Sequence, residues 1–171
     1  MKEKTATISF RVTESALKAL QEEAKKHNIS LNTLANQMFI EFAEYDRFLE
    51  RFRMVKLSTP TLKRIIEAAT DEAIVEAGKL AGASVPQSFM LAKSGEISVQ
   101  TVLEYLRLMG AHANLFDYSD VVHGGKDSVT LTHDLGPKGS LFLANYVQSI
   151  LNNLDKNAKI MQYPDAITVE M

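Results

Sequence analysis

The feature that most constrains the fold is a short alternating stretch near the N-terminus, Thr5-Ala6-Thr7-Ile8-Ser9-Phe10-Arg11-Val12. Because side chains alternate across a strand, its apolar residues share one face, namely Ile8, Phe10 and Val12. The polar residues share the other face, namely Thr7, Ser9 and Arg11. No second strand is expected for about a hundred residues, and a lone strand cannot satisfy its own backbone groups. The economical arrangement is a two-stranded antiparallel ribbon formed by two copies of the chain.

Two capped helices are predicted directly after this stretch. Thr13 is a good N-cap for a helix over 14–26, and Asn28 can take the left-handed conformation that ends it. Ser30 can cap a second helix that starts at Leu31. The apolar residues of that second helix recur every three or four positions: Leu34, Ala35, Met38, Phe39 and Phe42.

The order of strand, Thr-capped helix, Asn-Ile-Ser turn and second helix resembles the ribbon-helix-helix family of MetJ, Arc and CopG type repressors. The resemblance covers residues 5–45, about a quarter of the chain. It implies that the outward strand residues contact base edges in the major groove, which here are Thr7, Ser9 and Arg11. It also implies that backbone N–H groups at the start of the second helix bind phosphate, at Ser30, Leu31 and Asn32.

The residues themselves fit this interpretation. Arg11 can form a bidentate contact with guanine, and the hydroxyls of Thr7 and Ser9 can donate to or accept from several bases. Lys2 and Lys4 precede the strand and can reach flanking phosphates. The alternatives are the solvated outer face of an ordinary edge strand and an ordinary charged N-terminus.

Composition sets outer bounds on the kind of protein. The 171 residues suffice for one compact domain or two small ones, and the lack of Cys excludes disulfides and thiolate metal sites. No apolar stretch approaches the length that spans a bilayer, so we expect a soluble, cytoplasmic protein. Residues 1–56 hold ten Lys/Arg against eight Asp/Glu, and residues 57–171 hold nine against thirteen. This asymmetry agrees with DNA binding by the N-terminal part but supports it only weakly.

A domain boundary is predicted at Leu57-Ser58-Thr59-Pro60, because Thr59 can cap a helix and Pro60 suits its first turn. It divides the chain into a DNA-binding and dimerisation domain (1–56) and a sensing or oligomerisation domain (57–171). In the second domain we expect one helix from Pro60 to Leu80, ended by Gly82, and a loop with a short extended piece over 83–96. A helix capped by Ser98 follows and ends at Gly110.

The remaining sequence alternates between strand and helix patterns. Residues 113–122 and 128–133 predict a hairpin, 140–154 a helix, and 159–162 and 166–170 two short strands. The fold class expected for the whole chain is therefore α+β. It consists of an N-terminal ribbon-helix-helix with an intermolecular ribbon and a C-terminal α+β domain.

No residue pattern indicates catalysis, so we expect no enzyme activity, no cofactor and no metal. Asp120, His123, His133 and Asp134 flank the predicted hairpin and can converge on a metal, but ordinary turn polarity is the favoured interpretation. The 136–140 stretch at a helix start can hold an anion. A plain loop in which Ser140 caps the helix is favoured there.

Together these patterns favour a sequence-specific transcription regulator. Its expected partners are double-stranded DNA and a second copy of itself, with a tetramer and a small-molecule effector as open possibilities and no membrane partner. The alternative is a ribbon-helix-helix dimer used for assembly or antitoxin-like partner binding, without its own DNA readout.

Overall fold

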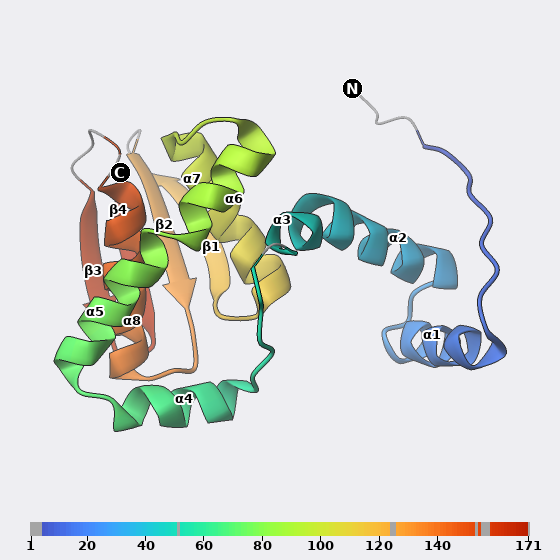
Figure 1. Ribbon diagram of the computed structural model, residues 1–171, viewed down its shortest axis with the longest axis horizontal. Coiled ribbons are helices and arrows are strands. Elements are labelled where there is room, and N and C mark those ends of the chain that lie inside the picture. Colours follow the sequence, from blue (N-terminus) through green and yellow to red (C-terminus); the bar gives the residue numbers. More distant parts are fainter. Residues whose placement is uncertain (1–4, 51, 124–125, 153, 155–157, 171) are drawn as a thin grey trace. The chain divides into compact units, whose positions relative to one another are not determined.

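The computed structural model describes residues 5–50, 52–123, 126–152, 154 and 158–170 (Figure 1). Its fold class is α+β, as predicted, with helices and a four-stranded antiparallel sheet. The chain divides into two compact units, Met1–Ala43 and Glu44–Met171. This division falls earlier than the boundary expected between residues 56 and 57.

The N-terminal unit contains the two capped helices expected from the sequence. Helix α1 (Glu14–Lys26) begins after Thr13, whose hydroxyl accepts the N–H of Ala16, and helix α2 (Leu31–Glu41) begins after Ser30. Asn28 has a φ of 54°, in the left-handed region, which ends α1 and turns the chain toward α2. Residues 5–13 form neither a helix nor a hydrogen-bonded strand within the single chain.

The C-terminal unit begins inside a helix. A π-helical turn, η1 (Phe42–Asp46), continues α2 across the division between the units and leads into α3 (Arg47–Leu49). Tyr45 and Leu49 are buried in the core of the second unit, where the Tyr45 ring lies 5.9 Å from that of Phe89. Residues 44–49 therefore belong to the C-terminal core rather than to the N-terminal unit.

Four helices follow before the sheet: α4 (Thr59–Ala68), α5 (Asp71–Gly82), α6 (Val85–Ser94) and α7 (Val99–Leu108). Helix α7 is capped by Ser98 as predicted and continues as a second π-helical turn, η2 (Met109–Ala113). Asn114, with a φ of 52°, ends this turn. The helical path therefore runs slightly past the end expected at Gly110.

The expectations for the helices between residues 58 and 95 were wrong in three respects. The single helix expected from Pro60 to Leu80 is two helices, because Ala69 is extended and the Thr70 hydroxyl accepts the Ala73 N–H to cap α5. Ser58, not Thr59, caps α4 and places Pro60 within its first turn.

The expected loop over 83–96 is helix α6. Its Pro86 lies in the first turn, where no intrahelical N–H is needed, and Gly95 takes the left-handed C-cap with a φ of 75°. Both residues therefore mark the ends of a helix rather than interrupt one.

The hairpin and the two final strands were predicted correctly. Strands β1 (Asp117–His123) and β2 (Lys126–Thr132) pair antiparallel, and β3 (Lys159–Tyr163) and β4 (Ala166–Glu170) complete the sheet in the order β1-β2-β4-β3. Its inner face supplies four fully buried side chains: Val129, Leu131, Ile167 and Val169. They join one core with Leu143, Val147 and Ile150 of helix α8 (Pro137–Leu151).

Helix α5 crosses α8 at very short range, and α8 in turn packs against β3 and β4 (Figure 1). A Cβ built on Gly82 would lie 2.3 Å from the Tyr146 carbonyl oxygen, and one on Gly78 would lie 2.6 Å from the Phe142 carbonyl oxygen. Ser149 donates to the Lys79 carbonyl at 2.8 Å across the same contact. The two glycines therefore permit the close approach of the α5 and α8 backbones.

Candidate nucleic-acid interface

The three residues expected to contact bases lie in the segment that precedes α1. Thr7, Ser9 and Arg11 are exposed, and no helix covers them within their unit. The apolar residues that alternate with them, Ile8, Phe10 and Val12, are each more than half exposed as well. Lys2 and Lys4, the expected phosphate contacts before this segment, lie outside the described residues.

One contact orients this segment toward the second helix. The ring of Phe10 lies 5.4 Å from the ring of Phe39 on α2, a tilted aromatic pair. If this segment pairs as a strand, Ser9 and Arg11 would lie on the face opposite Phe10, because side chains alternate along a strand. In the single chain, the polar residues and the apolar residues of this segment are all exposed to solvent.

The N-terminal unit has almost no core of its own. Among its described residues only Ala24 is buried. Four large apolar side chains near the end of α2 are about half exposed: Met38, Phe39, Ile40 and Phe42. We call these four and the three exposed apolar residues of the leading segment together the N-terminal apolar surface, within which the rings of Phe10 and Phe39 are in contact. A unit this small rarely folds without a partner that covers such a surface.

The start of α2, where phosphate contacts are expected, is an ordinary helix start capped by Ser30. The Ser30 hydroxyl accepts the Thr33 N–H at 2.9 Å, and the Ser30 carbonyl accepts the Leu34 N–H at 3.0 Å. The N–H groups of Leu31 and Asn32 precede the intrahelical ladder and point out of the helix end, where the dipole favours an anion. Ser30 and Asn32 are exposed and Leu31 is half-buried, so a phosphate can approach from solvent.

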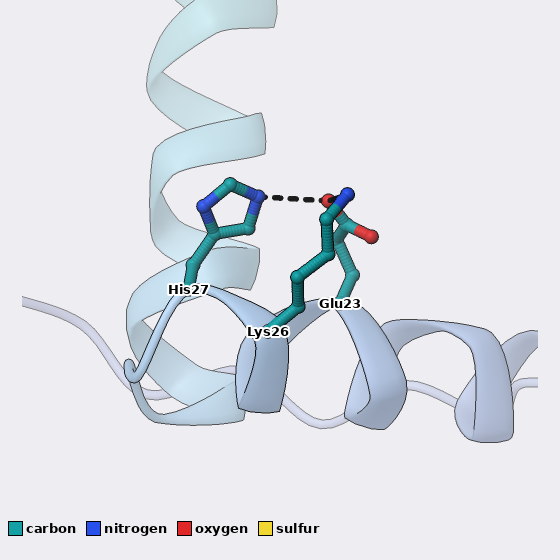
Figure 2. Close-up of polar contacts among 3 residues, drawn as sticks. All are labelled: Glu23, Lys26 and His27. Atoms are coloured by element: carbon teal, nitrogen blue, oxygen red, sulfur yellow. Dashed lines mark hydrogen bonds and ion pairs between the residues drawn. The ribbon is translucent and has the colours of Figure 1, made fainter.

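The end of α1 holds a small charged cluster (Figure 2). Glu23 binds the ring of His27 at 2.8 Å and the ammonium of Lys26 at 3.4 Å. The hydrogen bond from His27, followed by the charge of Lys26, lowers the pKa of the Glu23 carboxyl. Because the carboxylate engages both basic groups, this end of α1 offers less positive charge to a phosphate than its sequence indicates.

The possible metal site near the hairpin does not gain support. His133 is buried, and both ring nitrogens are engaged: Nδ1 accepts the Leu135 N–H at 3.1 Å and Nε2 donates to the Ser140 hydroxyl at 3.0 Å. The side chain of His123 lies outside the described residues. Elsewhere in the described chain, no three His, Asp or Glu side chains group closely enough to bind a metal.

The start of α8, a possible anion site, differs from the expectation in the position of Ser140. The helix begins after Gly136, whose φ is 73°, and Ser140 is buried one turn inside it. Ser140 therefore does not cap the helix, contrary to expectation. Its hydroxyl instead links His133 to the Ala166 carbonyl, 3.3 Å away.

Ile40 is the member of the N-terminal apolar surface that sequence reasoning missed. It falls outside the three-and-four spacing that identified the apolar stripe of α2. The available signal was the unbroken run Met38-Phe39-Ile40, since a helix that buries one stripe does not need three consecutive apolar residues.

Comparison with family models, curated proteins and solved structures finds no match for this chain. Over the part of the chain that the structure describes, no helix has both the length and the apolar character needed to cross a membrane.

Proposed function

We propose that this protein is a sequence-specific DNA-binding transcription regulator that acts as a homodimer with a ribbon-helix-helix N-terminal unit. The observation that carries the proposal is the N-terminal apolar surface, which two short helices with one buried residue cannot cover. A second copy covers it if the two leading segments pair as antiparallel strands over the helices.

In such a ribbon the alternation of polar and apolar residues gives one face that packs on the helices and one face that contacts DNA. Phe10 already lies against α2 through Phe39, so pairing the strands buries the apolar face against both pairs of helices. Thr7, Ser9 and Arg11 then form the opposite face, where a two-stranded ribbon fits the major groove. The free N–H groups at the start of α2 bind the flanking phosphates.

The C-terminal unit supports a role in sensing or oligomerisation. It has its own continuous core of helices and sheet, unlike a short pliable tail that folds on a partner. Residues outside the DNA-reading module can therefore form a stable platform for self-association or for an effector.

The decisive experiment is selection of bound sequences from a random pool of double-stranded DNA with the full chain. We expect a single enriched motif with two-fold symmetry, since a two-fold dimer reads two equivalent half-sites. Absence of binding at low salt across the whole pool would contradict the proposal. It would favour the alternative, an assembly or antitoxin-like dimer without DNA readout.

A further inference from the structure

An open groove of about 540 Å³ is lined by residues of α5 and by Leu141 of α8. Val75 of α5 and Leu141 of α8 form its apolar floor. Its rim carries three carboxylates and one lysine: Asp71, Glu72, Glu76 and Lys79. The groove therefore combines an apolar floor with excess negative charge, which suits an occupant with apolar and basic side chains.

One carboxylate on the rim, Glu72, is held in its ionised form. The pKa of Glu72 is lowered, mainly by a hydrogen bond from its own backbone N–H and then by the Thr70 hydroxyl. Asp71 lies 3.6 Å from Lys138, whose ammonium also donates to the carbonyls of Glu67 and Ala69. Lys138 thus partly balances Asp71 and also acts on Glu72, and the rim keeps an excess of negative charge that includes Glu72 and Glu76.

A segment with the complementary character lies in the same compact unit. Residues 53–57, between α3 and α4, form no helix or strand and carry three exposed apolar side chains: Met54, Val55 and Leu57. Val55 is 77% exposed, the highest value among the large apolar residues of the described chain. Arg53 and Lys56 are exposed beside them.

This segment cannot fill the groove of its own chain. The segment joins one end of α4, and α5 begins after the other end (Figure 1). Asp71, the first residue of α5, lines the groove. The ten residues of α4 hold the two features about 15 Å apart. A second copy can present its segment to the groove without any change in either fold.

We propose that the 53–57 segment of one copy binds in the α5 groove of a second copy, and that the second copy returns the same contact. Val55 and Leu57 cover Val75 and Leu141, while Arg53 and Lys56 face Glu72 and Glu76. The contact is self-complementary under a two-fold axis, so taken by itself it joins two copies into a closed pair. It does not depend on DNA binding or on the N-terminal ribbon.

Cysteine cross-linking tests the contact directly, because the natural chain contains no Cys. The full-length variants Val55→Cys and Val75→Cys are mixed under mild oxidation, so that only a disulfide between copies is scored. We expect at least fivefold more cross-linked product than from Val55→Cys mixed with Leu91→Cys, an exposed α6 control outside the groove. Equal yields from the two mixtures would overturn the proposal.

A charge exchange in the same variants tests the pairing of rim and segment. Lys56→Glu or Glu76→Lys alone should lower the cross-linked yield about two- to fivefold, as expected for exposed ion pairs. The two changes together should restore it. If the double change lowers the yield as much as the product of the single changes, the assigned pairing is wrong. Loss of the cross-link without loss of DNA binding would leave the proposed function intact.

Discussion

At the scale of single residues, Arg11 is the most specific reader that the chain offers. Its side chain is exposed, and its paired N–H donors match the O6 and N7 acceptors of guanine. We expect Arg11→Ala to weaken binding to the best site by about 1–3 kcal/mol per half-site. Binding to random DNA should change much less, because base contacts carry specificity. Competition titrations against both DNA classes measure the difference.

Lys4→Ala provides the matched control for Arg11→Ala. Removing a lysine that binds phosphate should weaken binding to all sequences alike and reduce the slope of the salt dependence by about one unit for each phosphate that is no longer neutralised. A similar fall in specific and random affinity in the two variants would place Arg11 on the DNA backbone. Thr7 and Ser9 would then be the remaining base readers.

His133 gives the C-terminal unit a dependence on pH. Burial lowers the pKa of its imidazole, an effect that Lys63 reinforces and that Asp165 and Asp134 oppose. Because the folded-state pKa lies below the unfolded value of 6.5, the unfolded chain takes up the proton first as the pH falls. The stabilisation is therefore complete above about pH 6.5 and is lost between that pH and the lower folded-state pKa.

Urea unfolding at pH 7.5 and pH 5 checks this dependence on the full chain. A protonated Nδ1 cannot accept the Leu135 N–H, so the wild type should lose more stability at pH 5 than His133→Gln, which does not titrate. The loss of stability of His133→Gln between the two pH values measures the contribution of the carboxylates and the other titratable groups. Identical losses in the two proteins would show that another group dominates the acid response.

At the scale of elements, the leading segment should act as a shared strand. In the single chain Phe10 is 62% exposed, so a charge there would cost little if the chain remained alone. In a ribbon Phe10 becomes part of the dimer core, and Phe10→Asp should abolish dimerisation and unfold the N-terminal helices. Sedimentation and circular dichroism measure both effects, with Ser9→Asp on the opposite face as the control. A Phe10→Asp protein that remains a fully helical dimer would exclude the ribbon.

Capping residues in the sequence predict most helix ends correctly, but they do not predict the break between α4 and α5 or the helix α6. Thr13, Asn28 and Ser30 identified the ends of α1 and the start of α2, because each has a specific backbone role. The sequence pattern does not predict the break between α4 and α5, because the apolar repeat continues across it without a change of spacing. Pro86 and Gly95 are typical of loops and therefore favour a loop over 83–96, but both residues also suit the two ends of a helix.

The crossing of α5 and α8 depends on Gly82 more than on any apolar side chain. A methyl group there would collide with the Tyr146 carbonyl, and the backbone of α8 cannot move without disturbing the sheet. Gly82→Ala should therefore lower the free energy of unfolding by about 2–4 kcal/mol despite the higher helix propensity of Ala. Thermal unfolding measures the loss. Ala77→Ser, at an exposed position of the same helix, should cost less than about 0.5 kcal/mol.

At the scale of the whole molecule, the chain divides into two compact units after Ala43, earlier than the boundary that the sequence predicts between residues 56 and 57. The apolar repeat of α2 continues through Tyr45, Phe48 and Leu49, so nothing in the spacing tells which core each residue joins. The candidate interface was predictable as a set of exposed polar residues, because strand alternation and capping are local. The α5 groove was not, since it brings α5 together with Leu141 from a distant helix.

The observed packing indicates that residues 44–56 contribute to the stability of the second unit. Tyr45 is buried and its hydroxyl donates to the Met109 sulfur at 3.1 Å, and Leu49 is buried in the same core. A fragment of residues 44–171 keeps both side chains, whereas a fragment of residues 57–171 loses them together with the partly buried Phe48 and Phe52. Removing two buried side chains of this size costs about 5 kcal/mol or more.

That loss equals a large part of the total stability of a typical domain. We therefore expect residues 44–171 to unfold cooperatively, and residues 57–171 to unfold at least about 10 °C lower. Calorimetry on the two fragments, with full-length Leu49→Ala as a control that keeps the chain intact, measures the difference. Leu49→Ala should lower the stability of the second unit by about 2–5 kcal/mol. Equal transition temperatures for the two fragments would mean that residues 44–56 only rest on a core that is complete without them, and that the unit begins where the Thr59-Pro60 signal indicates.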